Sequence, residues 1–371
     1  MSESGWNWRV RTPVNTAIAE QSLHNQCITR AGPRQPADVI AWLGAVQAQE
    51  YPAAKWALAL RMPDGTTDAA IDRAFDEGKI LRTHVMRPTW HFVTPADIRW
   101  MLELTAPRVH RALAYYRRQN GLDESLLNRA TTAFERALRD GHCLTRAELG
   151  AQLERAGIAA KGVRLALITI YAELEGAICS GPRRAKQITY TLLAQRAPRA
   201  ARLSRDEALA ELTRRYFTSH GPATVGDFLW WSGLAAADAR RGLEMNRARH
   251  VVVDDRTYWR VGGTTAGVTR RRTVHLLPVY DEYIVAYRDR EAVPHAPSAI
   301  ASRSRGNVTF QHALVIAGQI AGTWKAVRDA SGVIVDVIPR RRLTGPERRA
   351  LGETAACYGR FLDVPMSLSV A

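Results

Sequence analysis

The sequence predicts a mixed α/β, helix-rich fold with three tandem winged-helix units and a C-terminal β-rich module. Two observations predict it. Along the 371 residues, groups of helices that end in a short two-stranded hairpin recur three times, which is a repeat of architecture rather than of sequence. After residue 268 the pattern changes to short apolar strands with glycines near their turns. The length agrees with several units, because a chain of this size exceeds one ordinary hydrophobic core.

The first unit is predicted to span residues 10–120. Its helices are expected from near residue 15, from Asp38, over 53–61 and over 68–75, with two short strands within 79–93. The apolar stripe in DVIAWLGAVQ predicts a helix that starts at Asp38 and ends within residues 46–52. The run Thr94-Pro95-Ala96-Asp97 then starts a helix over 98–118, because it supplies an N-cap hydroxyl, an early proline and an acid.

The second and third units, residues 121–200 and 201–267, follow the same plan. Capping boxes that begin at Thr145 and Thr224 each open a helix. Further helices are expected over 125–139, 163–175, 207–218 and 235–246. Each unit closes with a hairpin. In the second unit, the hairpin tip over residues 180–186 consists almost entirely of turn residues and basic side chains. In the third unit, the hairpin turns at Asp254-Asp255.

Residues 268–371 are predicted to form a β-rich module covered by one helix. Strands are expected over 273–279, 314–317, 319–325 and 333–339, with Gly318, Gly322 and Gly332 at or near turns and a helix over 345–362. The β-rich texture separates this module from the helical units before it.

The charge of the chain predicts a polyanionic partner. The formal net charge is +16 at pH 7, and 47 of the 52 basic residues are arginines because only five are lysines. Nucleic acid is the first candidate for so basic a folded protein. The arginine preference by itself is also typical of a GC-rich genome, so the inference depends on the charge. The guanidinium fork nevertheless suits phosphate and guanine contacts.

Several classes of site and location are not supported by the sequence. The four cysteines lie far apart without metal-ligand spacing, so we expect no metal site and reduced thiols. The chain has no GxGxxG after a strand, no GxxxxGK[ST], no HExxH and no GxSxG. We therefore expect no cofactor. No apolar run is long enough to cross a bilayer, and no basic amphipathic helix supports a membrane partner. These features predict a soluble cytoplasmic protein.

The segment Val46-Gln47-Ala48-Gln49-Glu50-Tyr51-Pro52 is the main candidate site. An extended segment places Gln47 and Gln49 on the same side, whereas a helix would not. Extended geometry is favoured because the residue before a proline is pushed away from helical angles. Each amide carries a donor and an acceptor but does not titrate, which suits holding a water or reading a base edge. The alternative is a helix end with two solvated glutamines.

Further candidates lie on the predicted hairpins and loops. His91 either points into a pocket or is a satisfied, partly buried histidine. Asp281, Glu282 and Tyr283 are dense polar residues after a strand and form either a surface ion-pair cluster or the lining of a polar cleft. Basic residues on likely loops are either solvated or contact phosphates. These are Arg183, Arg184, Lys186, Arg303, Arg305, Arg340, Arg341 and Arg342.

Five separated motifs resemble those of the AlkZ-type family of bacterial DNA glycosylases, in the same order. They are VQAQEYPAAKWALALR, LRTHVMRPTWHFVTPADI, ICSGPRRAKQITYTLL, GPATVGDFLWWSGL and LLPVYDEYIVAYRDR. The resemblance covers nearly the whole chain from about residue 10. It implies three tandem winged-helix units plus a C-terminal β-barrel-like module in a C-shaped fold that embraces DNA.

The resemblance also implies an activity and its residues. The activity is hydrolytic excision of N7-alkylguanine, including bulky genotoxin adducts and interstrand crosslinks. The family's catalytic motif carries onto Gln47, Ala48 and Gln49. This QxQ form resembles the branch linked to self-resistance in producers of DNA-alkylating natural products, whereas a QxD form resembles a broader branch. The alanine between the glutamines is a minimal apolar residue, and this departure from the family's pattern bears on how that position packs.

The implied chemistry is consistent with two neutral amides. N7-alkylation makes guanine a cationic leaving group, so placing a water and stabilising an oxocarbenium-like sugar are the remaining tasks. Because this hydrolysis does not need a lysine nucleophile, we expect a monofunctional enzyme with no β-lyase activity. Because a bulky adduct does not fit a closed pocket, we expect an open cleft rather than base flipping.

The expected partner is double-stranded DNA carrying alkylated guanine, bound by a monomer with no protein partner implied. Two alternatives remain at this point. One is a non-catalytic winged-helix regulator, which accounts for the charge and the hairpins but gives the two glutamines no role. The other is a protein that sequesters a genotoxin directly.

Overall fold

Start and stop signals in the first part of the chain set the geometry of the candidate segment. The structure, a computed structural model, describes residues 14–30, 32–262, 273–288, 301–304 and 307–371. Helix α2 (Pro36–Leu43) ends earlier than expected, because Gly44 adopts a φ of 90° that side chains rarely tolerate. Strand β1 (Val46–Gln47) follows it directly. The extended geometry predicted for the candidate segment is confirmed at Val46 and Gln47. It is wrong further on, because Gln49 lies in a bend and Tyr51 begins helix α3 although it precedes a proline. The end of the preceding helix was wrong by about three residues.

The rest of the first helical group agrees with the sequence pattern. Its other elements are α1 (Val14–Asn25), α3 (Tyr51–Ala59), α4 (Asp68–Asp76), β2 (Leu81–His84) and β3 (Trp90–Val93). The Thr67 side chain caps α4 by accepting from the Ala70 N–H. The three strands form one small sheet in the order β1-β3-β2. Strand β1 thus joins the predicted hairpin as an edge strand.

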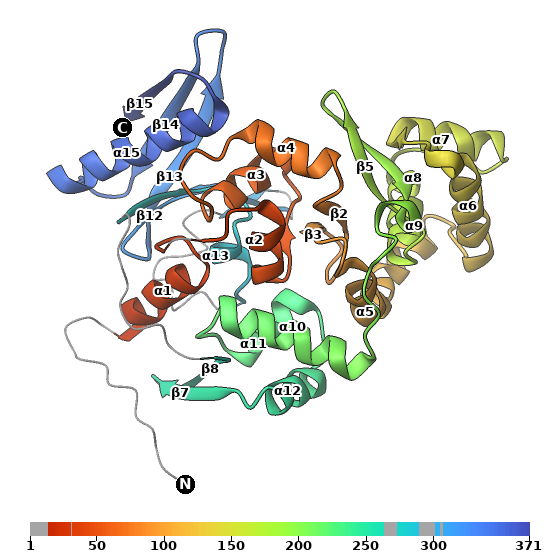
Figure 1. Ribbon diagram of the computed structural model, residues 1–371, viewed down its shortest axis with the longest axis horizontal. Helices are drawn as coiled ribbons and strands as arrows, with labels where there is room; N and C mark the ends of the chain where they lie inside the picture. The colour runs from red at the N-terminus through yellow and green to blue at the C-terminus, as the bar shows by residue number, and fades with distance from the viewer. Residues whose placement is uncertain (1–13, 31, 263–272, 289–300, 305–306) are drawn as a thin grey trace.

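The second group lies to one side of the first, at the right of Figure 1. Its helices are α5 (Ile98–Gln119), α6 (Glu124–Ala137), α7 (Arg146–Arg155), α8 (Gly162–Leu174) and the short α9 (Leu193–Arg196). Its strands are β4 (Leu144–Thr145), β5 (Ile178–Arg184) and β6 (Gln187–Leu192). The capping box at Thr145 is confirmed, since the side chains of Thr145 and Glu148 each bond the other's backbone N–H. Strand β5 extends further than expected, so only Ala185 and Lys186 remain in the turn.

The third group lies below the first in Figure 1. It consists of α10 (Arg205–Ser219), α11 (Val225–Ser232), α12 (Ala236–Met245), β7 (Arg249–Val253) and β8 (Arg256–Arg260). The Thr224 capping box and the turn at Asp254-Asp255 are both confirmed. Both aspartates of that turn have positive φ, as a tight hairpin turn requires.

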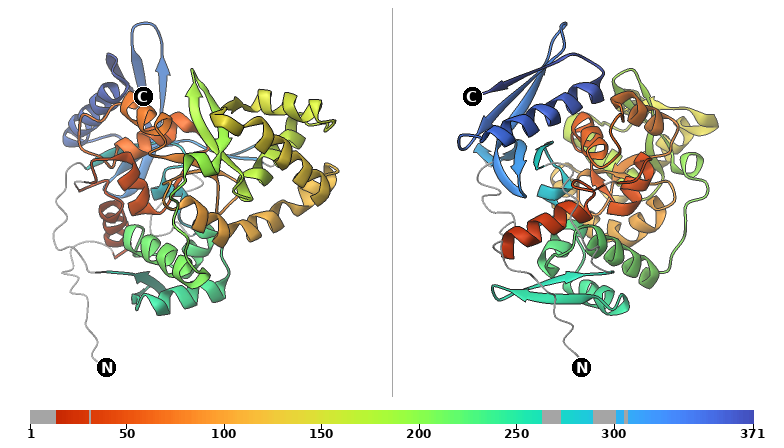
Figure 2. Two further views of the ribbon diagram at one scale, coloured as in Figure 1. Left: turned by 45° about the vertical axis from the view of Figure 1, so that its right-hand side comes forward. Right: turned by 60° about the vertical axis from the view of Figure 1, so that its left-hand side comes forward.

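The C-terminal module is an open sheet covered by a helix (Figure 2). Its main strands are β9 (Val274–Leu277), β12 (His312–Ile316), β13 (Gln319–Arg328), β14 (Val333–Pro339) and β15 (Met366–Val370), and its covering helix is α15 (Gly345–Leu362). The strand order is β15-β14-β13-β12-β9, with β14 and β15 parallel. The barrel-like expectation is therefore wrong for the part of the chain that the structure describes, because β15 and β9 remain as separate edges.

Smaller elements complete the module and correct two further expectations. These elements are α13 (Glu282–Val285), β10 (Ala301–Ser304) and β11 (Asn307–Phe310). Strand β15 was not expected from the sequence. Gly322 lies inside β13 rather than near a turn, and a Cβ there would come within 2.3 Å of the Ile338 backbone oxygen on β14. A close approach between strands, not a turn, is thus the reason for this glycine.

The candidate segment lies between two hydrophobic clusters. One cluster extends through the second and third groups and includes Ala45. The other joins the helices of the first group to the C-terminal sheet and includes Val46 and Ala48. The chain therefore passes from one cluster to the other at the segment that carries the two glutamines. Among the described residues, no helix is both long and apolar enough to cross a membrane.

Candidate active site

Gln47 lies in the edge strand β1, and Gln49 lies just after it in a bend. Gln47 lies opposite His91 of β3, and the Ala48 N–H donates to the Trp90 carbonyl oxygen at 2.7 Å. Ala48 is completely buried, whereas Gln47 is 8% exposed and Gln49 is partly exposed. The alanine between the glutamines therefore packs in the hydrophobic core.

Gln47 is fixed at both its backbone and its side chain. Its N–H donates to Glu282 Oε1 at 2.7 Å, and its side-chain Oε1 accepts from Arg87 Nη2 at 2.9 Å. Gln49 is held more loosely, since its Oε1 accepts from the Trp90 N–H at 3.4 Å. We call Gln47, Arg87, Glu282, Trp231 and His220 the Gln47 network.

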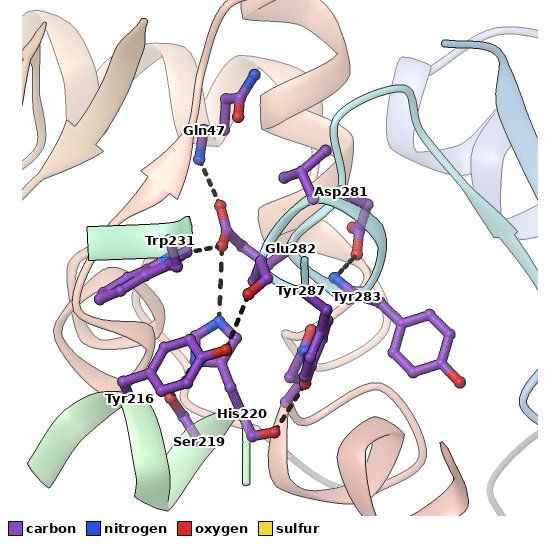
Figure 3. A network of polar contacts seen from close by, with 12 residues as sticks. Gln47, Tyr216, Ser219, His220, Trp231, Asp281, Glu282, Tyr283 and Tyr287 are labelled. Carbon is purple, nitrogen blue, oxygen red and sulfur yellow. Dashed lines mark hydrogen bonds and ion pairs between the residues drawn. The ribbon is translucent and has the colours of Figure 1, made fainter. Parts of the chain in front are cut away.

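Glu282 is the centre of this network (Figure 3). It is completely buried, and its Oε2 accepts from Trp231 Nε1 at 2.9 Å and lies 3.6 Å from His220 Nε2. Burial alone would raise the pKa of Glu282, but contacts with His220, the Gln47 N–H and the Arg87 charge together lower it. The site therefore contains an ionised carboxylate that solvent does not reach.

Helix α10 supplies the other side of the network. The Tyr216 ring stacks on His220 with centroids 4.8 Å apart and planes 9° apart, and its hydroxyl donates to the Ala286 carbonyl at 2.8 Å. The Tyr287 hydroxyl donates to the His220 carbonyl at 2.7 Å. Burial lowers the pKa of His220, and Glu282 offsets this only in part. These contacts tie the short helix α13 to the third group.

Asp281 and Tyr283 anchor α13. Arg61 forms a two-pronged ion pair with Asp281, with both N–O distances at 2.8 Å, and both side chains are buried. Asp281 also caps α13 by accepting from the Tyr283 N–H at 2.9 Å. The Tyr283 hydroxyl donates to the Gly318 carbonyl at 2.7 Å. The dense polar run is thus neither a surface cluster nor an open cleft lining, because all three candidates are buried.

His91 is a neutral neighbour of Gln47. It is completely buried, and its Nδ1 lies 2.9 Å from the Thr89 carbonyl, so Nδ1 carries the proton. Its Nε2 lies 3.4 Å from Arg87 Nη2. Burial, followed by the Arg87 charge, lowers the pKa of His91 to about 3. The ring is therefore neutral at physiological pH and does not act as a general acid there.

Comparison with known proteins identifies the family. The family model for "DNA glycosylase AlkZ-like" matches residues 40–361. The chain belongs to the AlkZ-like DNA glycosylase family. It is 25% identical over 308 residues to the interstrand DNA cross-link repair glycosylase of Streptomyces sahachiroi, covering 78% of this chain and 82% of that protein. The solved structure of Streptomyces sahachiroi DNA glycosylase AlkZ has the same fold. The TM-score is 0.79 at 22% identity, with 98% of this chain and 100% of that chain covered.

Membership in the AlkZ-like family makes this protein a DNA glycosylase and DNA its partner. The structure brings the separated motifs of the sequence to one place. Gln47 comes from the first motif, Arg87 from the second, Trp231 from the fourth and Glu282 from the fifth. No cluster of His, Cys, Asp and Glu suited to a metal occurs within the residues that the structure describes.

The basic candidates of this AlkZ-like protein divide into paired and unpaired groups. Arg183 pairs with Asp72 at 2.7 Å and Asp76 at 2.8 Å, which ties the β5–β6 hairpin to α4. Arg184 pairs with Glu148 and Arg341 with Glu347, both at 2.6 Å. The exposed candidates without an acidic partner among the described residues are Lys186, Arg340 and Arg342.

The predicted basic loop over 303–307 is only partly described. Arg303 lies in strand β10, which pairs with β11, so its placement on a loop was wrong. Arg305 lies outside the described residues.

Sequence reasoning on this AlkZ-like chain missed three members of the network, Arg87, Trp231 and His220. Arg87 lies within the second motif that the family resemblance used, between the two strands predicted over 79–93. Trp231 lies in a motif that the family resemblance used, which was the available signal. His220 had no local signal, because it meets Glu282 across a separation of 62 residues.

Proposed function

We propose that this DNA glycosylase hydrolyses the N-glycosidic bond of N7-alkylguanine in duplex DNA, including bulky adducts and interstrand crosslinks. The observation that carries the proposal is the pair of neutral amides, Gln47 at the end of strand β1 and Gln49 just after it, beside a histidine that stays uncharged. Such a site supplies no acid near neutral pH, so it suits a base that leaves without being protonated. The name of the Streptomyces sahachiroi relative supports the extension to crosslinks.

The reaction assigns each group a simple task. Alkylation at N7 leaves the purine cationic, so breaking the bond from C1′ to N9 returns both electrons to the ring and releases a neutral base. The oxygen of a water then bonds to C1′, and the water loses a proton to solvent. Gln47 and Gln49 hold the reacting groups in position. The ionised Glu282 behind Gln47 balances the charge of Arg87 close to the developing oxocarbenium ion.

The surrounding fold is proposed to bind the duplex. We assign winged-helix units to residues 10–120, 121–200 and 201–267, and together with residues 268–371 they form a C-shaped surface around DNA. Lys186, Arg340 and Arg342 are the favoured phosphate contacts, because they are exposed and free of acidic partners among the described residues. The enzyme acts as a monomer and binds the damaged duplex in an open cleft. It does not flip the base and has no β-lyase activity.

A panel of alkylated duplexes tests this proposal. It runs from N7-methylguanine through bulky N7 adducts to interstrand crosslinks, and base release is measured in single-turnover reactions. The wild type is expected to release at least one alkylguanine and leave an intact abasic strand. A Gln47→Ala, Gln49→Ala double variant is expected to bind the same duplex without releasing the base. Absence of release from every lesion, or strand cleavage by β-elimination, would refute the proposal.

A further inference from the structure

Arg87 determines which end of the Gln47 side-chain amide is left free of the guanidinium. A guanidinium has donors only, so the amide atom 2.9 Å from Arg87 Nη2 is the oxygen and not the nitrogen. The usual ambiguity between the two ends of an amide is thereby removed. The Gln47 Nε2 has no hydrogen-bond partner among the described residues, and the residue keeps 8% of its surface exposed. In Figure 3 it points away from Glu282.

Arg87 is itself held in place from several directions. Besides Gln47, its Nη2 lies 3.4 Å from His91 Nε2, and its Nη1 donates to the Val285 carbonyl at 3.4 Å. The same carbonyl accepts from Trp230 Nε1 at 3.0 Å. A planar fork can meet these groups together, whereas a lysine ammonium can replace only part of the arrangement.

The two glutamines are held differently, and this predicts different tasks. Donation by Arg87 draws electron density from the Gln47 oxygen, which weakens that oxygen as an acceptor and strengthens its N–H groups as donors. A water that attacks a sugar needs an acceptor for its proton, so Gln47 is the poorer choice to orient it. Among the residues that the structure describes, the Gln49 Oε1 accepts only one long contact, from the Trp90 N–H at 3.4 Å. It therefore keeps its capacity to accept from a water.

We propose that Arg87 is a positioning residue that makes Gln47 a hydrogen-bond donor to the departing alkylguanine, while Gln49 orients the water. The departing base is the suitable acceptor, because it gains electron density as its bond to the sugar breaks. A bond from Gln47 to the base therefore becomes stronger in the transition state than in the ground state, which is the condition for lowering the barrier. This inference rests on the proposed glycosylase reaction.

Two matched substitutions test the division of tasks. Gln47→Glu removes the donor and keeps the shape, and its carboxylate is accommodated by Arg87. Gln49→Glu introduces the same change near Arg82, whose Nη2 lies 3.4 Å from the backbone carbonyl oxygen of Gln49. Single-turnover excision is measured on the lesion that the wild type releases fastest, and duplex affinity is measured in parallel. Gln47→Glu is expected to slow release by roughly 10²-fold to 10³-fold, whereas Gln49→Glu is expected to stay within about tenfold of the wild type.

The opposite order, or equal losses in both variants, would overturn the inference while leaving the proposed reaction intact. Failure of the wild type to release any base would instead overturn the proposed reaction. Both variants are first compared with the wild type by thermal unfolding, so that rates are measured on folded protein.

The role of Arg87 is tested through Gln47. Arg87→Met is expected to lower kcat with little change in KM, and Arg87→Lys is expected to recover part of the loss. In a Gln47→Ala background, Arg87→Met should have no further effect, because the two residues act as a unit. A purely structural role would predict additive losses instead. If Arg87 contacted a phosphate, its removal would reduce the salt dependence of binding by about 0.9 in the log–log slope, and that result would also overturn the inference.

Discussion

Removal of the Glu282 carboxylate should destabilise the fold and slow base release. Glu282→Ala leaves two buried donors unpaired, the Gln47 N–H at 2.7 Å and Trp231 Nε1 at 2.9 Å. Each unpaired buried donor costs about 1–3 kcal/mol, so the free energy of unfolding is expected to fall by about 2–6 kcal/mol. Glu282→Gln keeps one oxygen acceptor but turns an amide N–H2 toward one of the donors, so its loss should be about half as large.

Urea unfolding and single-turnover excision measure the two effects separately. Both variants are expected to release base more slowly than their remaining folded fraction predicts, because the backbone of Gln47 loses its fixed position. Glu154→Gln is a suitable control, since Glu154 is about half exposed and forms a surface pair with Lys161 at 3.4 Å. A Glu282→Ala protein that unfolds at the wild-type urea midpoint and releases base at the wild-type rate would contradict the role given to this network.

Three further perturbations test other parts of the structure. Lowering the pH from 7 to 5 should cost about 2 kcal/mol through His91 alone. The unfolded histidine takes up a proton below pH 6.5 while the folded one, with its pKa lowered to about 3, does not; a His91→Gln variant should lack this part of the pH dependence in urea unfolding. Gly233→Ala should destabilise by roughly 1–3 kcal/mol, because Gly233 has a φ of 69° and a Cβ would lie 2.5 Å from the Met86 carbonyl. Base release should fall more than duplex binding, since Arg87 is the next residue, and an unchanged rate would contradict this. Lys186→Ala should reduce the salt slope of duplex binding by about 0.9, whereas Arg183→Ala should lower stability without changing that slope; the reverse pattern would show that Arg183 meets a phosphate.

Local signals in the sequence were sufficient for most of the helices. The capping boxes at Thr145 and Thr224 and the turn at Asp254-Asp255 depend on residues within a few positions of each other, and all three are confirmed. The predicted end of α2 was wrong because Gly44 ends the helix although the apolar stripe in the sequence continues beyond it. A helical pattern therefore does not reveal where a glycine with positive φ will interrupt it.

Contacts between distant segments could not be predicted in the same way. The bond from the Gln47 N–H to Glu282 joins residues 235 positions apart, and the ion pair of Arg61 with Asp281 spans 220 positions. The sequence indicated that Asp281, Glu282 and Tyr283 were unusual for their polarity. It did not indicate that they are buried, because burial depends on partners from two other parts of the chain. The resemblance to a family supplied the motifs but not their contacts.

The proposed catalytic pair of amides is held by buried charged residues from distant parts of the chain. Gln47 lies where two hydrophobic clusters meet, and a two-residue edge strand has few bonds of its own to resist displacement. Glu282 holds its backbone and Arg87 holds its side chain, while the adjacent Asp281 fixes α13 through Arg61. Neighbouring carboxylates thus have different tasks: one anchors the helix that carries the other. Arg61→Met should consequently reduce base release through movement of Glu282 even though Arg61 does not touch Gln47. The combination Arg61→Met, Asp281→Leu should recover stability, since replacing both partners avoids a buried unpaired charge. It should not recover the rate, because the cap of α13 is lost with Asp281.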